Sequence, residues 1–285
     1  MFQNAVTVVA EKAAEGAGKA NNFAKFGKAV ADNVGFFMVV VGTAVGLVVL
    51  SLLLERIAYK MNGQKRVKMN TLTIAVCGML SAIAAVLMWF EFPVFFAPVT
   101  MYKMDFSDIP AIIAGMTFGP VSGVVVEFVK IILKALILKP TSTAFVGEYA
   151  NFVVGCALVV PASFIFQCRR NIKGMLFGGI AGVLVMTTFG TAMNAIYFIP
   201  KFAAMFGAPV EAIVEAGTEI WPSIDSLTKF VFYCVAPLNL LKGSVAIALV
   251  LVAYRPIMSA IRSLTVSQNA APVEEKNTEY TPAKG

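Results

Sequence analysis

The sequence predicts an all-α, polytopic membrane protein, and three observations support this fold class. Hydrophobic residues make up 59% of the 285 residues and charged residues only 14%, with a mean hydropathy of +0.81. A water-soluble protein carries about 25% charged residues. Apolar runs such as residues 35–54 are long enough to cross a hydrocarbon core about 30 Å thick. The charges lie mostly at the ends of these runs, so the net charge of +7 fits lipid headgroups of a bilayer better than nucleic acid.

The residue types that are missing argue against an enzyme. The chain has no histidine, which is the commonest general base, proton relay and metal ligand. It contains no GxxxxGK(S/T) phosphate-binding loop, so we do not expect it to hydrolyse ATP itself. The cysteines are far apart and form no CxxC pair, and we expect four free thiols at Cys77, Cys156, Cys168 and Cys234. We therefore predict no catalytic residue, no metal site and no cofactor.

The chain begins with a polar segment and one spanning helix. Residues 1–34 are polar to mildly amphipathic, with lysines placed between Ala and Gly. Residues 35–54 form the first predicted span, and the basic cluster that follows within 55–68 anchors its end in the cytoplasm. A second span is predicted at 71–90, and a loop rich in aromatic residues and Pro follows at 91–108.

The next apolar stretch, at 109–138, is interrupted by Gly119 and Pro120. Proline lacks the amide that a helix interior needs and restricts the residue before it. We therefore predict a short helix at 108–118 and a longer helix at 120–138. A short helix that cannot cross the lipid must be covered by protein, which indicates a nearby pocket.

Three more spans complete the predicted bundle. The remaining segments follow in this order: loop 139–147, span 148–166, connector 167–173, span 174–199 ending at Pro200, loop 201–225, span 227–254 and a polar cytoplasmic tail at 259–285. The predicted cytoplasmic connections hold ten Lys and Arg residues, whereas the later outer loops hold four. This asymmetry predicts an outside N-terminus, a cytoplasmic C-terminus and seven membrane segments.

The last predicted span contains two polar residues near its middle. Asn239 and Lys242 are three residues apart, so they share one helix face, and Pro237 precedes them. Polar groups at this depth are costly and indicate a functional site. A ligand with carbonyl and ring-nitrogen acceptors would satisfy both side chains. Alternatively, Lys242 pairs with a buried acid such as Glu127, or extends to an interface.

Charged and polar residues share helix faces elsewhere. Glu127 and Lys130 can satisfy each other across one turn, and Lys134 on the same face can reach the outer interface. Glu148 and Asn151 repeat the three-residue spacing at the outer end of a span. The Glu148 carboxylate either favours the helix N-terminus or belongs, with Asn151, to a binding site.

Candidate ligand contacts also occur near aromatic residues. Asn194 places an amide close to Tyr197 at the outer end of its span, which suits a flat heteroaromatic ligand, although packing between helices could also satisfy the amide. The loop at 91–108 adds Tyr102, Met104 and Asp105 as candidates. Its aromatic residues form either an interfacial belt or a lid over the pocket.

The second span carries a stripe of small residues, formed by Gly78, Ser81, Ala82 and Ala85. Small residues one turn apart let another helix approach closely. That helix belongs either to this chain or to a partner protein.

Four blocks of the sequence, in the right order, resemble one known family. They are DFSDIPAIIAGMTFGPVSGVVVEFVK, GEYANFVVG, MTTFGTAMNAIYFIP and VAPLNLLKGSVAIALVLVAYRPI. They are similar to the riboflavin-specific S component (RibU) family of energy-coupling factor (ECF) vitamin transporters. The resemblance implies a six-helix S-component bundle at 68–258, with one extra N-terminal transmembrane helix and a basic cytoplasmic linker at 35–67.

The resemblance also implies a function and partners. Such a protein captures riboflavin, as a transported ligand, from outside the cell membrane and docks on a transmembrane coupling protein with two ATPase subunits. It implies that Asn194, Asn239 and Lys242 contact the flavin ring system, and that the small-residue stripe docks on the coupling protein. Family members often have two alanines where this stripe has Gly and Ser. The first span, 35–54, and the 34 residues before it have no counterpart in the compact family members.

Other functions fit parts of the same pattern. An S component for another vitamin or for a flavin nucleotide would differ in pocket polarity, and a phosphorylated ligand would favour an Arg near the outer mouth, where the sequence shows none. A stand-alone ion-coupled carrier would use the buried Lys and Glu residues. An intramembrane enzyme or a structural protein is disfavoured because paired catalytic residues are missing.

Overall fold

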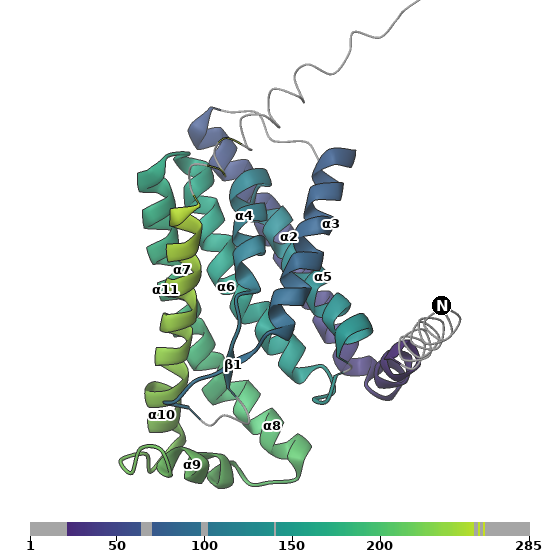
Figure 1. Cartoon of the computed structure of the whole chain (residues 1–285), viewed down its shortest axis with the longest axis vertical. Helices are drawn as coiled ribbons and strands as arrows, with labels where there is room; N and C mark the ends of the chain where they lie inside the picture. The colour runs from purple at the N-terminus through teal and green to yellow at the C-terminus, as the bar shows by residue number, and fades with distance from the viewer. Residues whose placement is uncertain are drawn as a thin grey trace, which may run out of the picture.

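The computed structural model describes residues 22–63, 70–97, 102–139, 141–253, 256 and 259. Within these ranges the chain forms a bundle of long helices with one small hairpin (Figure 1). Five of the described helices are long and apolar enough to cross a membrane, which confirms the all-α membrane fold class. The end of the predicted basic linker, from residue 64 onward, and nearly all of the predicted tail lie outside the described residues.

The helices follow the predicted order of segments. Their bounds are α2 Val34–Asn62, α3 Thr71–Trp89, α4 Asp108–Phe118, α5 Pro120–Leu133, α6 Val146–Cys168, α7 Ile172–Met193, α8 Ile199–Phe206, α9 Val210–Thr218, α10 Leu227–Phe230 and α11 Ala236–Val252. Three π-helical segments continue them: η1 Lys134–Leu138, η2 Asn194–Phe198 and η3 Val231–Val235. The strands β1 Phe92–Pro93 and β2 Lys103–Met104 pair antiparallel in the loop after α3.

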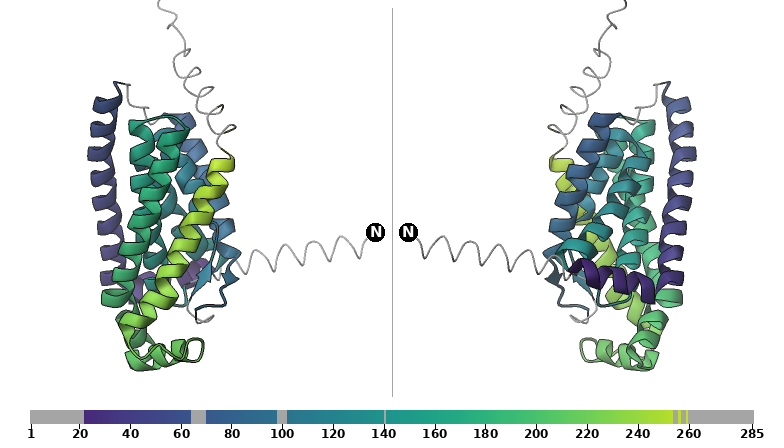
Figure 2. Two further views of the ribbon diagram at one scale, coloured as in Figure 1. Left: turned by 90° about the vertical axis from the view of Figure 1, so that its left-hand side faces the viewer. Right: turned by 90° about the vertical axis from the view of Figure 1, so that its right-hand side faces the viewer.

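The bundle is built around α6, which packs against α7, α5, α4 and α2. Beyond these neighbours, α11 lies along α7, and α3 lies along α5 and α4 (Figures 1 and 2). A Cβ atom on Gly178 or Gly182 of α7 would lie 2.6 Å from a backbone carbonyl oxygen of α6. Glycine at these positions therefore lets the two helices approach closely, as small residues do between membrane helices.

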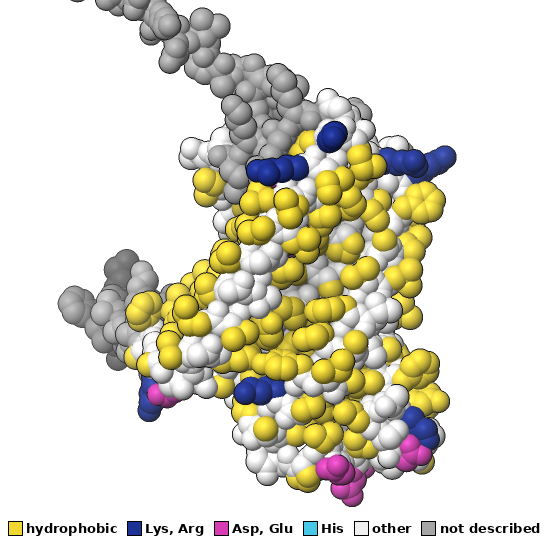
Figure 3. Space-filling view, turned by 180° about the vertical axis from the view of Figure 1, so that it is seen from behind, with side chains coloured by type: hydrophobic (Ala, Val, Ile, Leu, Met, Phe, Trp, Pro, Cys, Tyr) yellow, Lys and Arg dark blue, Asp and Glu magenta, His cyan; other side chains and the backbone are white. Residues whose placement is uncertain are grey.

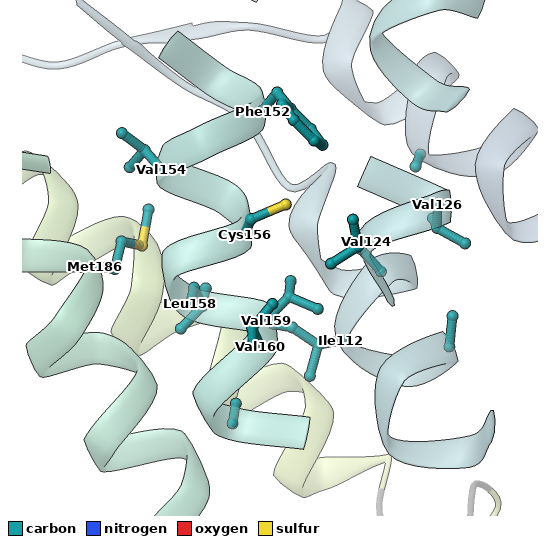
Figure 4. Packing of buried hydrophobic residues seen from close by; sticks show 14 of the residues in the cluster. Ile112, Val124, Val126, Phe152, Val154, Cys156, Leu158, Val159, Val160 and Met186 are labelled. Carbon is teal, nitrogen blue, oxygen red and sulfur yellow. The ribbon is translucent and has the colours of Figure 1, made fainter. Parts of the chain in front are cut away.

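The apolar core lies between α6 and its neighbours. In Figure 4 the side chains of Phe152, Cys156 and Val159 on α6 point toward Ile112 on α4 and Val124 on α5. These five residues are at most 1% exposed. Because lipid is as apolar as these side chains, close van der Waals packing is the force that holds this core together.

The predicted break at Gly119 and Pro120 is confirmed. Helix α4 ends at Phe118, Gly119 has a φ of +110°, and Pro120 starts α5, where its missing amide costs no hydrogen bond. The backbone N–H of Val121 donates to Oε1 of Glu55, at 3.0 Å. A Cβ on Gly119 would clash with the same carboxylate, so glycine is needed here both for its φ and for space.

The first span is longer than predicted. Helix α2 continues to Asn62, whereas residues from Glu55 onward were expected to form a basic linker. Glu55 is only 2% exposed, because its carboxylate satisfies the start of α5 rather than facing solvent. Part of the predicted polar segment 1–34 is also helical, since residues 22–32 form a helix that ends at a turn before α2. This helix is the dark purple one across the lower part of the right-hand view in Figure 2.

The prediction that Pro200 ends its span and opens a loop at 201–225 is wrong. The helix continues through η2 and α8 to Phe206, and α9 follows at Val210–Thr218. In η2 the N–H of Ile199 bonds to the carbonyl of Asn194, five residues back, and Pro200 then stands in the first turn of α8. Pro209 similarly precedes the first residue of α9. Both prolines start helices, a position that proline tolerates.

The two ends of the bundle differ in charge. The end that carries the last turns of α2 and α11 and the start of α3 holds the connections predicted to be cytoplasmic (Figure 1). In Figure 3 this end, at the top, shows Lys and Arg side chains, the opposite end shows acidic and basic side chains, and the surface between them is largely apolar. This distribution is consistent with the predicted orientation.

Candidate functional site

A cavity of about 300 Å³ lies at the α8 end of the bundle. Its walls come from the end of α3, strand β2 and the turn after it, η1, the loop before α6, the start of α6, and α8. It is lined by Met88, Glu91, Lys103, Asp105, Lys134, Lys139, Ser142, Thr143, Gly147, Glu148, Asn151, Phe202 and Phe206. Of the candidate ligand residues, Asp105, Glu148 and Asn151 line this cavity.

Asp105 joins three elements beside the cavity. Its Oδ2 atom lies 3.2 Å from Nζ of Lys242 on α11 and accepts a 3.4 Å hydrogen bond from Nδ2 of Asn151 on α6. Its Oδ1 atom accepts from the backbone N–H of Ser107, at 2.9 Å, which fixes the turn before α4. Asp105 is 6% exposed. The structure thus brings three predicted site residues into one cluster.

A buried chain of ion pairs continues from Lys242 into the bundle. Nζ of Lys242 lies 3.1 Å from Oδ2 of Asp108. The other carboxylate oxygen of Asp108, Oδ1, is 2.6 Å from Nζ of Lys130. Lys130 in turn lies 2.7 Å from Oε2 of Glu127, one turn away on α5. The predicted Glu127–Lys130 pair is confirmed. The alternative that Lys242 pairs with a buried acid is also confirmed, but the acids are Asp105 and Asp108 rather than Glu127. Burying these charges is tolerable because each has an opposite charge in contact.

Asn194 is held by the protein itself. The hydroxyl of Tyr102 donates to Oδ1 of Asn194 at 3.0 Å, and Nδ2 of Asn194 donates to the carbonyl of Gly190 at 2.8 Å. Burial, with a smaller contribution from the charge of Cys234, raises the pKa of Tyr102, so its hydroxyl stays a hydrogen-bond donor. Tyr102 and Asn194 therefore connect the β1–β2 loop to η2, and neither lines the cavity.

Two side-chain amide atoms near this cluster lack hydrogen-bond partners among the described residues. They are Nδ2 of Asn239 on α11 and Oδ1 of Asn151 on α6. A Cβ on Gly190 would lie 2.6 Å from Nδ2 of Asn239, so glycine makes room for this amide against α7. Buried polar atoms are nearly always satisfied, and an unsatisfied pair therefore calls for an explanation.

Glu148 holds the loop that precedes it. Its Oε2 atom accepts hydrogen bonds from Oγ1 of Thr141, at 3.0 Å, and of Thr143, at 3.3 Å.

The candidates Tyr197 and Met104 do not line the cavity. Tyr197 stacks edge-on against Tyr149, and Met104 packs against a smaller apolar cluster that includes Phe230.

Several cavity residues were not predicted as site residues. Glu91 accepts from Lys134 at 2.8 Å and from Lys103 at 3.1 Å, at the rim of the cavity. Burial raises the pKa of Glu91, but the hydrogen bonds and charges of both lysines outweigh it and lower the pKa overall. Phe202 and Phe206, whose rings stack on one face of α8, also line the cavity. Their four-residue spacing is the signal that would have identified a helix in the predicted loop.

The small-residue stripe on α3 is divided between two faces. Gly78 and Ala82 are exposed, whereas Ser81 and Ala85 are 1% and 3% exposed and face the bundle. The Ser81 hydroxyl donates to the carbonyl of Cys77 at 2.8 Å. A partner helix could therefore contact only the Gly78 and Ala82 half of the predicted stripe.

Comparison with known proteins gives consistent matches. The family model described as "ECF transporter, substrate-specific component" matches residues 70–254. The riboflavin transporter FmnP of Bacillus subtilis (strain 168) is 31% identical over 199 residues, which cover 68% of this chain and 98% of that protein. The riboflavin transporter RibU of Staphylococcus aureus (strain TCH60) is 29% identical over 205 residues, which cover 72% of this chain and all of that protein.

A solved structure of the S component of a bacterial ECF transporter shares this fold. It is 30% identical to the chain, with a TM-score of 0.51, and the match covers 66% of this chain and 96% of that one. The helices that precede residue 70 lie outside the range of the family model. The protein is a multi-pass component of the cell membrane and not an enzyme. The chain belongs to the family of substrate-specific components of ECF transporters.

Proposed function

We propose that this chain binds riboflavin from outside the cell and delivers it inward as part of an ECF transporter. The observation that carries the proposal is that relatives named riboflavin transporters are matched over 98% and 100% of their lengths. The residues at the cavity are chemically suited to such a ligand. A volume of about 300 Å³ lies at the lower end of the range of ligand pockets, about 300–1,000 Å³.

The flavin ring system would take up the unsatisfied polar atoms of the site. Its pyrimidine edge alternates carbonyl oxygens with N–H and ring-nitrogen positions, and an amide can donate to and accept from such an edge. Nδ2 of Asn239 and Oδ1 of Asn151 supply one donor and one acceptor that have no other partner among the described residues. Lys242, which already pairs with Asp105 and Asp108, would supply a charged donor beside them, although neither Lys242 nor Asn239 is among the residues that line the cavity. The ribityl hydroxyls would meet Glu148 and Thr143 on the cavity wall.

The cycle we propose uses the loop over the cavity as a lid and partner subunits as the energy source. The loop from Phe95 to Asp108, which carries Tyr102 and Asp105, closes over the bound ligand. The exposed Gly78 and Ala82 face of α3 docks on the transmembrane coupling protein. ATP hydrolysis in two partner ATPases then tips the component in the membrane, so that the cavity opens to the cytoplasm.

A flavin nucleotide is a second candidate ligand, because lysines line the cavity where the sequence offered no arginine. Lys134 and Lys103 are paired with Glu91, whereas Lys139 has no ion pair among the described residues. The acids Glu91, Asp105 and Glu148 line the same cavity and oppose a phosphate. Riboflavin is therefore the better fit.

The direct test is to purify the protein from cells grown with riboflavin and to record its absorption spectrum. A yellow preparation supports the proposal if the protein, after removal of the bound ligand, also quenches the fluorescence of added riboflavin. A colourless protein that fails to quench riboflavin fluorescence rejects it. Competition by flavin mononucleotide at equal concentration separates the two candidate ligands. Uptake into vesicles that lack any ATPase would instead support an ion-coupled carrier.

A further inference from the structure

The cavity wall formed by residues 141–147 contains two residues with a strained backbone, which must be held in place. Ala144 and Phe145 have φ values of +45° and +67°, in the left-handed region that non-glycine residues rarely adopt. Such residues persist only when the surrounding structure determines their conformation. Ser142 and Thr143 immediately before them line the cavity. Whatever fixes Phe145 therefore also fixes part of the candidate site.

Hydrogen bonds tie this turn to the cavity carboxylate. The backbone N–H of Phe145 donates to Oγ1 of Thr141 at 3.0 Å, and that of Gly147 donates to Oγ1 of Thr143 at 3.1 Å. The same two hydroxyls donate to Oε2 of Glu148. A change in the conformation of the turn would consequently move the Glu148 partners and the cavity wall together.

The side chain of Phe145 is held by the N-terminal helices. Its ring is 3% exposed, and its centroid lies 5.6 Å from that of Phe26 and 5.4 Å from that of Phe37. Phe26 and Phe37 are themselves 6.5 Å apart, so the three rings pack mutually. Nearby, Nδ2 of Asn22 donates to the carbonyl of Ile137 at 3.3 Å. The helix at 22–32 and the first turn of α2 thus cover the outside of the strained turn.

A second row of contacts extends the same cover to α6 and α8. The hydroxyls of Thr43 and Tyr149 are 3.2 Å apart, and the ring of Phe36 lies 5.6 Å from that of Tyr149. The ammonium of Lys201 on α8 lies 5.8 Å from the centre of the Phe36 ring. All of these N-terminal residues precede residue 70, where the family match begins. They form an addition to the shared bundle at the cavity end.

We propose that residues 22–43 are a built-in brace that holds the turn at Thr141–Gly147 in its left-handed conformation and thereby sets how tightly the cavity retains its ligand. Phe26 and Phe37 are positioning residues: they act through Phe145 and do not line the cavity. The effect on affinity rests on the proposed function, because it requires this cavity to be the riboflavin site. The effect on the turn does not depend on the ligand.

The test uses the full chain in lipid nanodiscs and two readouts. A spin label on Ser142→Cys, in a Cys168→Ser background, reports the mobility of the turn, and a label on Phe177→Cys of α7 reports the distant end of the bundle. Riboflavin affinity and dissociation rate are measured by fluorescence quenching. The variants are Phe26→Ala with Phe37→Ala, the conservative pair Phe26→Leu with Phe37→Leu, and Phe23→Ala, which alters an exposed ring on the same helix.

We expect the double alanine variant to raise label mobility at residue 142 but not at 177, and to weaken riboflavin binding about tenfold, mainly through faster dissociation. The leucine pair restores most of the low label mobility at residue 142 and most of the riboflavin affinity. Phe23→Ala changes neither the mobility nor the affinity. Unchanged mobility at residue 142 overturns the brace. Increased mobility at residue 142 with unchanged riboflavin affinity overturns the proposal that the brace sets how tightly the cavity retains its ligand. If the parent protein binds no riboflavin, the proposed function fails, and the mobility at residue 142 still decides whether the brace exists. Should the double alanine variant not fold, Phe145→Gly, which tolerates the positive φ but lacks the ring, is tested for the same two changes.

Discussion

Oε1 of Glu55 accepts a hydrogen bond from the backbone N–H of Val121, at 3.0 Å, and so links the added helix α2 to the point where α4 gives way to α5. The first amides of a helix have no partner within the helix. A carboxylate satisfies one of them and also interacts favourably with the positive end of the helix dipole. One side chain outside the family match therefore stabilises the interruption on which the shared bundle depends.

We predict that Glu55→Ala destabilises the protein by about 1–3 kcal/mol, because the buried Val121 amide loses its acceptor. Glu55→Gln keeps an acceptor without the charge and should cost less. Thermal unfolding in detergent, followed by circular dichroism, measures both. Glu211→Ala, which removes an exposed carboxylate on α9, is the control. An equal midpoint for Glu55→Ala and this control would contradict the link.

Lys242→Ala and Asn239→Ala should each weaken riboflavin binding by about 1–3 kcal/mol, if both side chains hydrogen-bond the ring system. Fluorescence titration gives the affinities. Lys229→Ala removes a lysine whose ion pair with Asp225 lies on the surface, and it should bind as the parent does. Unchanged affinity in both test variants would move the ligand to another site.

Replacing Gly78 by Leu should separate binding from transport. Gly78 is exposed on α3 and away from the cavity, so riboflavin affinity should stay within about twofold of the parent. Riboflavin uptake in cells that carry the coupling protein should fall severely, because a large side chain prevents close approach of a partner helix. Phe177→Leu, at an exposed position of α7, controls for general effects of lipid-facing changes. Normal uptake by Gly78→Leu would exclude this face as the docking surface.

The ion pairs of Glu91 should make stability fall in acid. Its pKa in the folded protein is lowered from 4.5 by Lys134 and Lys103, although burial opposes them. The stabilisation is therefore complete above pH 4.5 and is lost as the pH falls below that value through the lowered pKa. Comparing unfolding midpoints of the parent and Glu91→Gln at pH 7 and pH 4 tests this. The two proteins should differ more at pH 7, and an equal difference at both values would assign the acid sensitivity to other groups.

The order of the membrane segments could be predicted because each one is encoded locally. Apolar length located the spans, and the lack of a proline amide located the break at Pro120. The Glu127–Lys130 pair was predictable for the same reason, since its members are one helical turn apart. The continuation past Pro200 was missed because a preceding π-helical segment lets proline begin a new helix without ending the span.

The contacts between distant segments could not be predicted from spacing. Asp105 meets Lys242 across 137 positions, and only the folded bundle brings the turn before α4 to the face of α11. The same holds for Phe26 and Phe145. In the sequence Phe26 belongs to a mildly amphipathic segment and Phe145 to a loop, and only the folded structure shows that their rings are in contact. Residue types could thus identify candidate site residues, but the sequence could not show which of them pair with one another.

The side of the bundle on which α2 attaches affects how this chain could share machinery with shorter relatives. Helix α2 packs on α5 and α6, while Gly78 and Ala82 of α3 remain uncovered by the described residues. An appendage placed there adds mass without covering the proposed docking surface for a common energising module. Long and short versions of the component could therefore compete for one pool of that module, and a cell could acquire the longer form without replacing it.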